Sequence, residues 1–332
     1  MIIMKDNSEK LIKDFDNKIH LYKGLAERTN ILLNSLVENS IKPHQLEFRL
    51  KDKDSFTKKL IRKNFKYKSL EQVTDILGFR LVTYFEDDID IIEKIIIKEF
   101  EIDYENSIDK RKMEVDKFGY RSVHYVVSLN KERLKLTEYK DFKKIKFEIQ
   151  IRSILQHSWA EIEHDIGYKG ASEIPSSAKR TFYRVAALLE QADIEFTKLR
   201  QEIKEYEKNI EKELMNENLN IQLNKSSLIA FIKGSKVLNE IEKTVADRIN
   251  CNISDDIDLD LIGNKELILD LNNLNIKTVN ELEKSLIKNT DELITSQDEF
   301  LKIFNKNVAK PEAYGTFIKG APILWLRNLL KK

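Results

Sequence analysis

The sequence predicts an α+β protein that is extended by a helical region at its C-terminal end. Up to about residue 170, short segments in which apolar and polar residues alternate are interleaved with segments of helical periodicity. This arrangement is typical of a sheet that is flanked by helices. From about Asn216 the chain becomes rich in asparagine, leucine and isoleucine and shows only short helical patterns. We therefore expect two domains, residues 1–215 and 216–332.

The composition indicates a helix-rich intracellular protein. The 332 residues include only 9 glycines and 4 prolines, and 34% of them are charged. The 57 basic residues nearly balance the 56 acidic ones, so a site for a polyanion has to be a local cluster of cations. The single Cys251 excludes an internal disulfide, and no apolar run is long enough to span a membrane. We expect a cytoplasmic protein without contact to a membrane.

The clearest local pattern is a strand followed by a helix between Lys144 and Lys169. Apolar residues at 145, 147, 149 and 151 alternate with Lys146, Glu148, Gln150 and Arg152, which therefore share the outer face of the strand. On its own, the pattern also fits an ordinary half-exposed strand with a solvated face. Ser153 and Gln156 have the spacing of a helix capping box. The buried stripe of the helix is expected at Ile154, Trp159, Ile162 and Ile166.

A cluster of basic residues precedes an acidic position in the first quarter of the chain. The segment 46–51 predicts a strand on which Arg49 and Lys51 point to the same side. A helix that begins at Asp54 or Ser55 follows, and it carries Lys59, Arg62 and Lys63 within about two turns. Lysine-rich helices are usually solvated faces, but this one is followed closely by Asp75.

Residues 70–129 predict two further strands and the loop between them. A helix is expected to end at Gly78, with a strand at 79–85 and a second helix at 89–99. The polar segment 103–117 is interpreted as a loop, and Gly119 as a turn before the strand that contains His124. Tyr120 lies where the loop enters this strand. Its ring either covers the edge of the core or stacks on a flat ligand such as a nucleobase.

The segment after residue 180 predicts one long helix and then several short ones. Apolar residues recur at alternating spacings of three and four from Phe182 to Ile210, which is a heptad pattern and favours a bundle or a coiled coil. We expect a homo-oligomer on this ground. Short helices are predicted at 226–249, 265–271, 279–287 and 297–304, and the apolar stretch 317–330 is expected to dock on the rest of the chain.

Four groups of residues, in this order along the chain, resemble the motifs of the RelA/SpoT alarmone synthetases. The groups are Arg49, Lys51, Ser55, Lys59 and Lys63; Asp75, Gly78 and Arg80; Gly119, Tyr120, Arg121, Ser122 and His124; and Glu148 to Arg152 with Trp159 to His164. The resemblance covers roughly residues 15–215. It implies a nucleotidyltransferase-like synthetase fold with a mixed sheet of about five strands flanked by helices.

The resemblance also implies an activity, which is the transfer of the β,γ-pyrophosphate of ATP to the 3′-hydroxyl of GTP or GDP. The product would be (p)ppGpp, the signal of the stringent response. Asp75 and Glu148 would be the catalytic residues and the ligands of Mg²⁺, with Glu148 as second ligand or as base. ATP would be bound by Arg49, Lys51, Lys59, Lys63 and Arg80, and the acceptor by Tyr120, Arg121, His124, Gln150 and Arg152.

Two alternatives stay open at this point. Phe118 stands where the family commonly has asparagine, which favours a toxic member that acts on the 3′ end of tRNA or on adenine nucleotides, restrained by residues 216–332. The other is a catalytically silent module that binds nucleotide or RNA. No hydrolase motif precedes the synthetase motifs, so we expect no alarmone-degrading activity. His157, Glu161 and His164 have spacings that would allow a metal site on one helix, but the resemblance makes this helix structural.

Overall fold

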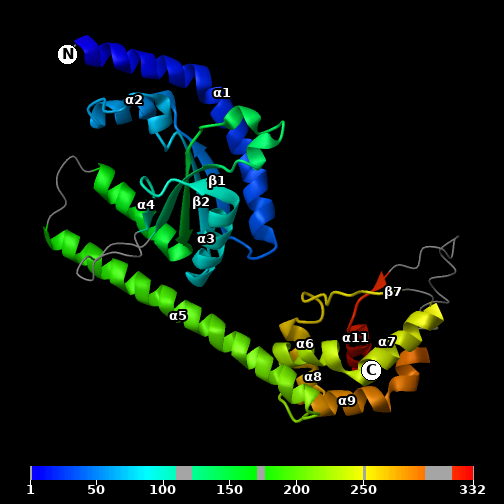
Figure 1. Cartoon of the computed structure of the whole chain (residues 1–332). Helices are drawn as coiled ribbons and strands as arrows, with labels where there is room; N and C mark the ends of the chain where they lie inside the picture. Colours follow the sequence, from blue (N-terminus) through cyan, green and yellow to red (C-terminus); the bar gives the residue numbers. More distant parts are fainter. Residues whose placement is uncertain (1, 110–121, 170–175, 250–251, 296–315, 332) are drawn as a thin grey trace. The chain divides into compact units, whose positions relative to one another are not determined.

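The structure is a computed structural model, and it describes residues 2–109, 122–169, 176–249, 252–295 and 316–331 (Figure 1). The chain divides into two compact units, Met1–Leu199 and Arg200–Lys332. The division falls inside helix α5 (Ser176–Met215), whereas the sequence placed a domain boundary at the end of this helix. The difference arises because one continuous helix contributes residues to both units.

The first unit is built on a mixed six-stranded sheet with the order β1-β2-β6-β5-β3, in which β4 pairs with β5. The strands are β1 (Gln45–Leu50), β2 (Leu77–Thr83), β3 (Phe100–Ile102), β4 (Ile108–Asp109), β5 (Val123–Leu129) and β6 (Phe147–Ser153). β2 and β6 are parallel, and the other neighbouring strands are antiparallel. The predicted α+β class with a mixed sheet flanked by helices is thus confirmed. The sequence missed β3 and β4.

Helices cover both faces of the sheet. They are α1 (Ile2–Glu38), α2 (Lys53–Arg62), α3 (Asp87–Glu99) and α4 (Ile154–Lys169). Short 3₁₀ turns lie at Leu70–Gln72, Arg133–Lys135 and Lys140–Phe142. Leu25 of α1 and Ile92 of α3 are completely buried in one core with Phe147 of β6. Burial of such a side chain stabilises the fold by about 1.5–3 kcal/mol. α1 and α3 therefore cover the apolar face, and α4 lies over the other face (Figure 1).

The register of the strands arranges polar residues of this other face in rows. In the first row, Arg49 of β1 pairs with Gly78 of β2, which pairs with Glu148 of β6. The second row contains, in register, Glu47, Arg80, Gln150 and His124. Residues paired in register have their side chains on the same face, and a step of two residues along a strand is about 6.6 Å. Residues far apart in sequence are thereby brought side by side.

The junction between β6 and α4 confirms the predicted capping box. The Gln156 amide N–H donates to Ser153 Oγ, and the Ser153 amide N–H donates to Gln156 Oε1, both over 3.1 Å. Trp159 is buried, with its ring 3.8 Å from that of Phe182. Ile162 and Ile166, predicted in the buried stripe, are each 51% exposed. That prediction is wrong because only the first turns of α4 are covered by neighbouring residues.

Two expected element boundaries are also wrong. Gly78 does not end a helix but lies inside β2, where its neighbours in register are Arg49 and Glu148. Helix α2 begins after Asp52, not at Asp54 or Ser55, because the Asp52 carboxylate accepts the Ser55 amide N–H over 2.7 Å and caps the helix.

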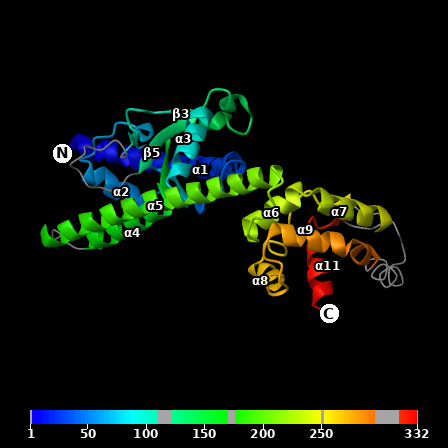
Figure 2. The same cartoon turned by 90° about the horizontal axis from the view of Figure 1, so that it is seen from below.

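The second unit is helical, as the sequence predicted. Its helices are α6 (Lys225–Gly234), α7 (Lys236–Ile249), α8 (Lys265–Asn273), α9 (Val279–Lys288) and α11 (Ala321–Leu330), and β7 (Asn252–Ile253) pairs with β8 (Thr316–Phe317) (Figure 2). Ile323 and Leu326 of α11 are completely buried, so the last stretch docks in the core of this unit. The helix predicted at 297–304 lies outside the described residues.

The predicted long heptad helix is α5, but much of its apolar stripe is uncovered. Phe196, Leu199 and Ile203 are each 50% exposed, whereas Ile210 is buried. Within the described ranges, no helix combines the length and apolar character needed to cross a membrane.

Candidate active site

The first part of the site is an acidic residue held between two lysines. Asp75 precedes β2, Lys51 follows β1, and Lys59 lies in α2. The amide N–H of Lys51 donates to the Ile76 carbonyl over 2.8 Å, which fixes the chain after β1 beside the start of β2. Lys59 Nζ lies 2.5 Å from Asp75 Oδ1, and Lys51 Nζ lies 3.4 Å from Asp75 Oδ2.

The lysines keep Asp75 ionised. Burial alone would raise the pKa of Asp75, but the hydrogen bond and charge of Lys59, together with the charge of Lys51, outweigh it and lower the pKa below its usual value. Asp75 is therefore a carboxylate at neutral pH, and it lies next to two ammonium groups of the kind that bind phosphate.

The second part of the site is Glu148 in the first row of the sheet. His124 Nδ1 lies 2.8 Å from Glu148 Oε1. Burial raises the pKa of Glu148, but the hydrogen bond and charge of His124 and a hydrogen bond from Gln150 reverse this effect and lower it overall. The Asp75 carboxylate acts in the opposite direction, so its charge reaches Glu148. The two acids are therefore within electrostatic reach of each other, and their shared role in catalysis stays a prediction.

His124 contacts two polar residues of β6, Glu148 and Arg152. Ser122 Oγ lies 3.0 Å from His124 Nε2, and Arg152 Nη2 lies 3.4 Å from the same nitrogen. With a proton on Nδ1 the ring donates to the Glu148 carboxylate, and Ser122 Oγ and Arg152 Nη2 both lie within reach of Nε2. His124 consequently holds the Glu148 carboxylate in a fixed orientation.

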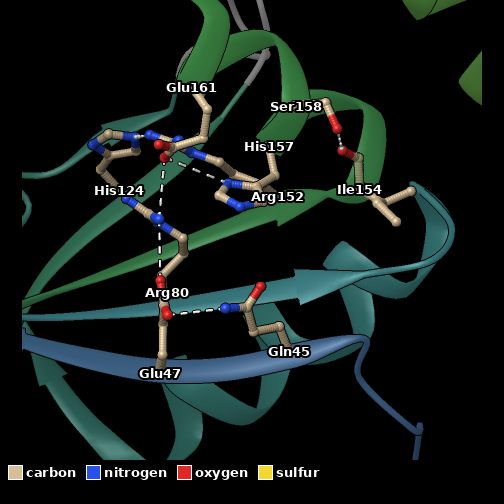
Figure 3. A network of polar contacts seen from close by, with 9 residues as sticks. All are labelled: Gln45, Glu47, Arg80, His124, Arg152, Ile154, His157, Ser158 and Glu161. Atoms are coloured by element: carbon tan, nitrogen blue, oxygen red, sulfur yellow. Dashed lines mark hydrogen bonds and ion pairs between the residues drawn. The ribbon is translucent and has the colours of Figure 1, made fainter. Parts of the chain in front are cut away.

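A third group surrounds Arg80 in the second row (Figure 3). Arg80 Nη1 lies 3.0 Å from Glu47 Oε1 and 3.1 Å from Glu161 Oε1, so two carboxylates share one guanidinium nitrogen. Glu161 and His157 reach the sheet from α4, and Arg152 lies beside them (Figure 3). Burial and the charges of Arg80 and Arg152 lower the pKa of His157, although Glu161 and Glu47 act against this shift. His157 is therefore neutral at neutral pH.

The residues present fit a magnesium ion. Mg²⁺ is usually bound by one or two carboxylates together with substrate phosphates and water. Asp75 and Glu148 provide two ionised carboxylates within electrostatic reach of each other, although in the described ranges no group of three or more potential ligands occurs. The alternative metal site on α4 is therefore not formed, and Glu161 is engaged by Arg80.

The structure brings most of the sequence-predicted residues together. Arg49 and Lys63 are exposed, and among the predicted ATP-binding residues only Lys51 and Lys59 pair with Asp75 in the part of the chain described. Arg80 contacts Glu47 and Glu161, and its binding of ATP stays a prediction. The predictions for Phe118, Tyr120 and Arg121 lie outside the described residues.

Sequence reasoning did not assign Glu47 to the site, and it considered His157 and Glu161 only as ligands of a metal on one helix. For Glu47 a signal existed, because it alternates with Arg49 and so shares its face of β1. Glu161 had no comparable signal, since its contact with Arg80 depends on how α4 lies over the sheet.

Comparison with known proteins gives an independent result. The family model described as a region found in RelA / SpoT proteins matches residues 48–173. GTP pyrophosphokinase YjbM of Bacillus subtilis (strain 168) is 32% identical over 203 residues, which cover 58% of this chain and 92% of YjbM. The chain belongs to the RelA/SpoT family. This membership confirms the resemblance that the four groups of residues indicated.

Two further RelA/SpoT relatives match the same part of the chain. GTP pyrophosphokinase YwaC of the same organism is 26% identical over 214 residues, covering 60% of this chain and 96% of YwaC. The crystal structure of small alarmone synthetase 1 from Bacillus subtilis has 27% identity and a TM-score of 0.49, covering 58% of this chain and 98% of that one. Both curated relatives are pyrophosphokinases, which is the enzyme class predicted from the motifs.

Proposed function

We propose that this chain transfers the β,γ-pyrophosphate of ATP to the 3′-hydroxyl of GTP or GDP and so makes (p)ppGpp. The observation that carries the proposal is a pair of ionised carboxylates: Asp75 lies between Lys51 and Lys59, and its charge reaches Glu148. The names of YjbM and YwaC support the same reaction. A silent binding module would have no need for both acids.

The donor ATP is assigned to the side of Asp75. Lys51 and Lys59 exchange their contacts with Asp75 for contacts with ATP phosphates, and the exposed Arg49 and Lys63 contribute further positive charge. Asp75 and Glu148 would hold Mg²⁺, which when bound neutralises charge on the phosphates. Most of the reduction of the barrier then comes from positioning and charge neutralisation.

Glu148 is assigned the role of general base. It accepts the proton of the acceptor 3′-hydroxyl, whose oxygen forms a bond to the β phosphorus of ATP. The bond between this phosphorus and the α–β bridging oxygen breaks, and AMP leaves. His124 orients Glu148 through the 2.8 Å contact and keeps it ionised.

The acceptor is assigned to the second row and to Arg152. Gln150 and His124 lie in register there, next to Glu148, and are suited to fix the acceptor ribose. Tyr120 is proposed to stack on the base, and Arg121 to contribute a further cation. Because ATP and GTP are cytoplasmic metabolites, we also place the protein in the cytoplasm.

Labelled ATP tests the reaction directly. The purified chain is incubated with Mg²⁺, ATP labelled at the β phosphate, and GTP, GDP, ATP or deacylated tRNA as acceptor. Label on GTP or GDP is the expected result. Label on tRNA or on adenine nucleotides alone would replace the proposal with the toxic type of activity, and label on no acceptor would leave a silent binding module.

We further propose that the chain forms a homo-oligomer through the uncovered stripe of α5. Phe196, Leu199 and Ile203 continue a heptad pattern and are each half exposed. Charges of both signs, such as Lys198 and Glu202, flank the stripe and allow pairing with a second copy. Leu199→Lys should lower the mass measured by light scattering to that of a monomer, whereas Lys198→Glu on the flank should change it little.

A further inference from the structure

A buried carboxylate of α5 contacts the junction between β6 and α4. Ser153 Oγ donates a hydrogen bond to Asp193 Oδ2 over 2.7 Å. Ser153 is completely buried, and Asp193 is only 3% exposed. A carboxylate is costly to bury unless hydrogen bonds compensate for the loss of water, so the contact with Ser153 helps to hold Asp193 in the interior. The four groups of residues that resemble the family motifs do not include Asp193.

The hydrogen bond to Asp193 fixes the orientation of the Ser153 hydroxyl. A hydroxyl group donates one proton and accepts through its lone pairs. The proton is directed to Asp193, which leaves the lone pairs of Oγ for the amide N–H of Gln156, 3.1 Å away. Asp193 thereby keeps Ser153 in the conformation that caps the first turn of α4.

A second contact between α4 and α5 is made by two aromatic rings. The ring centroids of Trp159 and Phe182 lie 3.8 Å apart. From Ser153 to Trp159 the chain of α4 moves forward while the partners on α5 move back from Asp193 to Phe182, so the two helices run in opposite directions (Figure 2). Apolar rings tolerate small displacements, whereas a hydrogen bond is directional. The bond between Ser153 and Asp193 therefore sets the position of α5 along α4.

A short series of contacts connects the junction to the proposed base. Ser153 directly follows Arg152 in β6. Arg152 Nη2 lies 3.4 Å from His124 Nε2, and His124 Nδ1 lies 2.8 Å from Glu148 Oε1. A shift of Ser153 therefore displaces the guanidinium of Arg152 and, with it, the ring that orients the proposed base. A misplacement of about 1 Å can lower a rate by about a hundredfold.

We propose that Asp193 is a positioning residue for the pyrophosphate transfer, which acts through Ser153 on the carboxyl end of β6. Asp193 is buried and contacts the junction, so its effect on the reaction is indirect. Lys51 and Lys59, which are assigned to ATP, lie outside β6 and α4, so ATP binding does not depend on Asp193. The inference rests on the proposed function, because it takes Glu148 as the base.

A double-mutant cycle with Asp193→Ala and Ser153→Ala tests the inference. Each single variant should lower kcat at saturating ATP and GTP by about tenfold to a hundredfold, while the Kd for a non-hydrolysable ATP analogue stays within about twofold. The double variant should be no slower than the slower single variant, because both changes remove the same hydrogen bond. If Asp193→Ala does not fold, Ser153→Ala alone decides, since it removes the donor and keeps the carboxylate.

Ile96→Val is the control for lost stability. Ile96 is completely buried in α3, which covers the apolar face of the sheet. The variant should lower Tm but leave kcat unchanged at a temperature at which it is folded. An unchanged kcat in Ser153→Ala would overturn the inference. A loss of ATP affinity as large as the loss of kcat, or losses that multiply in the double variant, would overturn it as well.

Hydrogen exchange separates this inference from the proposed function. If the function is wrong, the wild-type chain transfers no label to GTP or GDP. Exchange of the Gln156 amide, which Ser153 Oγ caps, can be measured without any turnover. In Asp193→Ala this exchange should be about fivefold or more faster than in the wild type, and the exchange of amides in β1 should not change. Unchanged exchange at Gln156 would show that Asp193 does not hold the junction.

Discussion

Lys59 Nζ lies 2.5 Å from Asp75 Oδ1, so a cation proposed to hold ATP and an acid proposed to hold its metal neutralise each other before any nucleotide is bound. The ion pair is well shielded, because the side chains of Lys59 and Asp75 are 13% and 29% exposed. The two side chains are therefore already held together in the structure. In the proposed reaction, ATP and Mg²⁺ would replace each side chain as the partner of the other.

Lys59→Met should weaken ATP binding while preserving the fold. The variant loses a charged hydrogen bond to phosphate, so the KM for ATP should rise about tenfold to a hundredfold. Lys58→Met on the exposed side of the same helix is the control and should leave the KM unchanged. Steady-state kinetics at saturating acceptor measure both, and an unchanged KM in Lys59→Met would remove Lys59 from the donor site.

Glu148→Gln should abolish transfer without abolishing ATP binding. The amide cannot accept the hydroxyl proton, so kcat should fall by about a hundredfold or more, while the Kd for ATP stays within about tenfold. Glu101→Gln, an exposed glutamate of β3, serves as control. Turnover close to that of the wild type in Glu148→Gln would show that Glu148 is not the base.

The pH dependence of the reaction should respond to His124. The pKa of Glu148 is lowered chiefly by the hydrogen bond and charge of His124, acting against burial. The base is active when ionised, so activity is lost as the pH falls through this pKa, and the loss should begin below the ordinary value for glutamate. In His124→Asn the pKa rises, and the acid limb of kcat/KM should move to higher pH. A limb that stays in place or moves to lower pH would contradict this role of His124.

The stability of the first unit should depend on pH through the ionisation of Asp75 and Glu148. Asp75 and Glu148 both have folded-state pKa values below their ordinary ones. Such groups contribute stability above the pKa of the unfolded chain, and this contribution disappears as the pH falls through the folded-state pKa. In Asp75→Asn and Glu148→Gln, thermal denaturation should therefore show a smaller loss of Tm on acidification than in the wild type.

Removal of the second unit tests whether it restrains the enzyme. If residues 216–332 inhibit the first unit, a chain that ends at Met215 should be about fivefold or more active. A factor of about five corresponds to the weakest coupling energies that are typical of allosteric regulation. Ile323→Asp provides a second route, because a charge at this completely buried position should unfold the second unit without shortening the chain. Unchanged activity and unchanged oligomeric state in both would exclude a regulatory role.

The strands that carry the site were predictable because their patterns are long and strict. In β6, Phe147, Ile149 and Ile151 are all completely buried, in alternation with Glu148 and its polar neighbours. β3 and β4 were not predictable, since they comprise only three and two residues and form by pairing with β5. Local sequence carries little signal for segments of this length.

In the candidate site, too, some residues were predictable from the sequence and some contacts were not. Asp75 and Glu148 were found through the resemblance and through the side of the strand on which Glu148 lies. The resemblance also assigned Arg80 to ATP, but it gave no sign of the partners Glu47 and Glu161, which come from β1 and α4. A contact between a strand and a helix far along the chain depends on tertiary packing, which spacing within one segment does not report.

The position of β6 in the sheet has a consequence for protein synthesis. β6 comes last in the chain among the six strands, yet it lies between β2 and β5. A ribosome must therefore release residues 147–153 before the two earlier halves of the sheet can join. A translation product that ends before β6 lacks Glu148 and leaves β2 and β5 with open edges, so an interrupted message should yield no partly active enzyme.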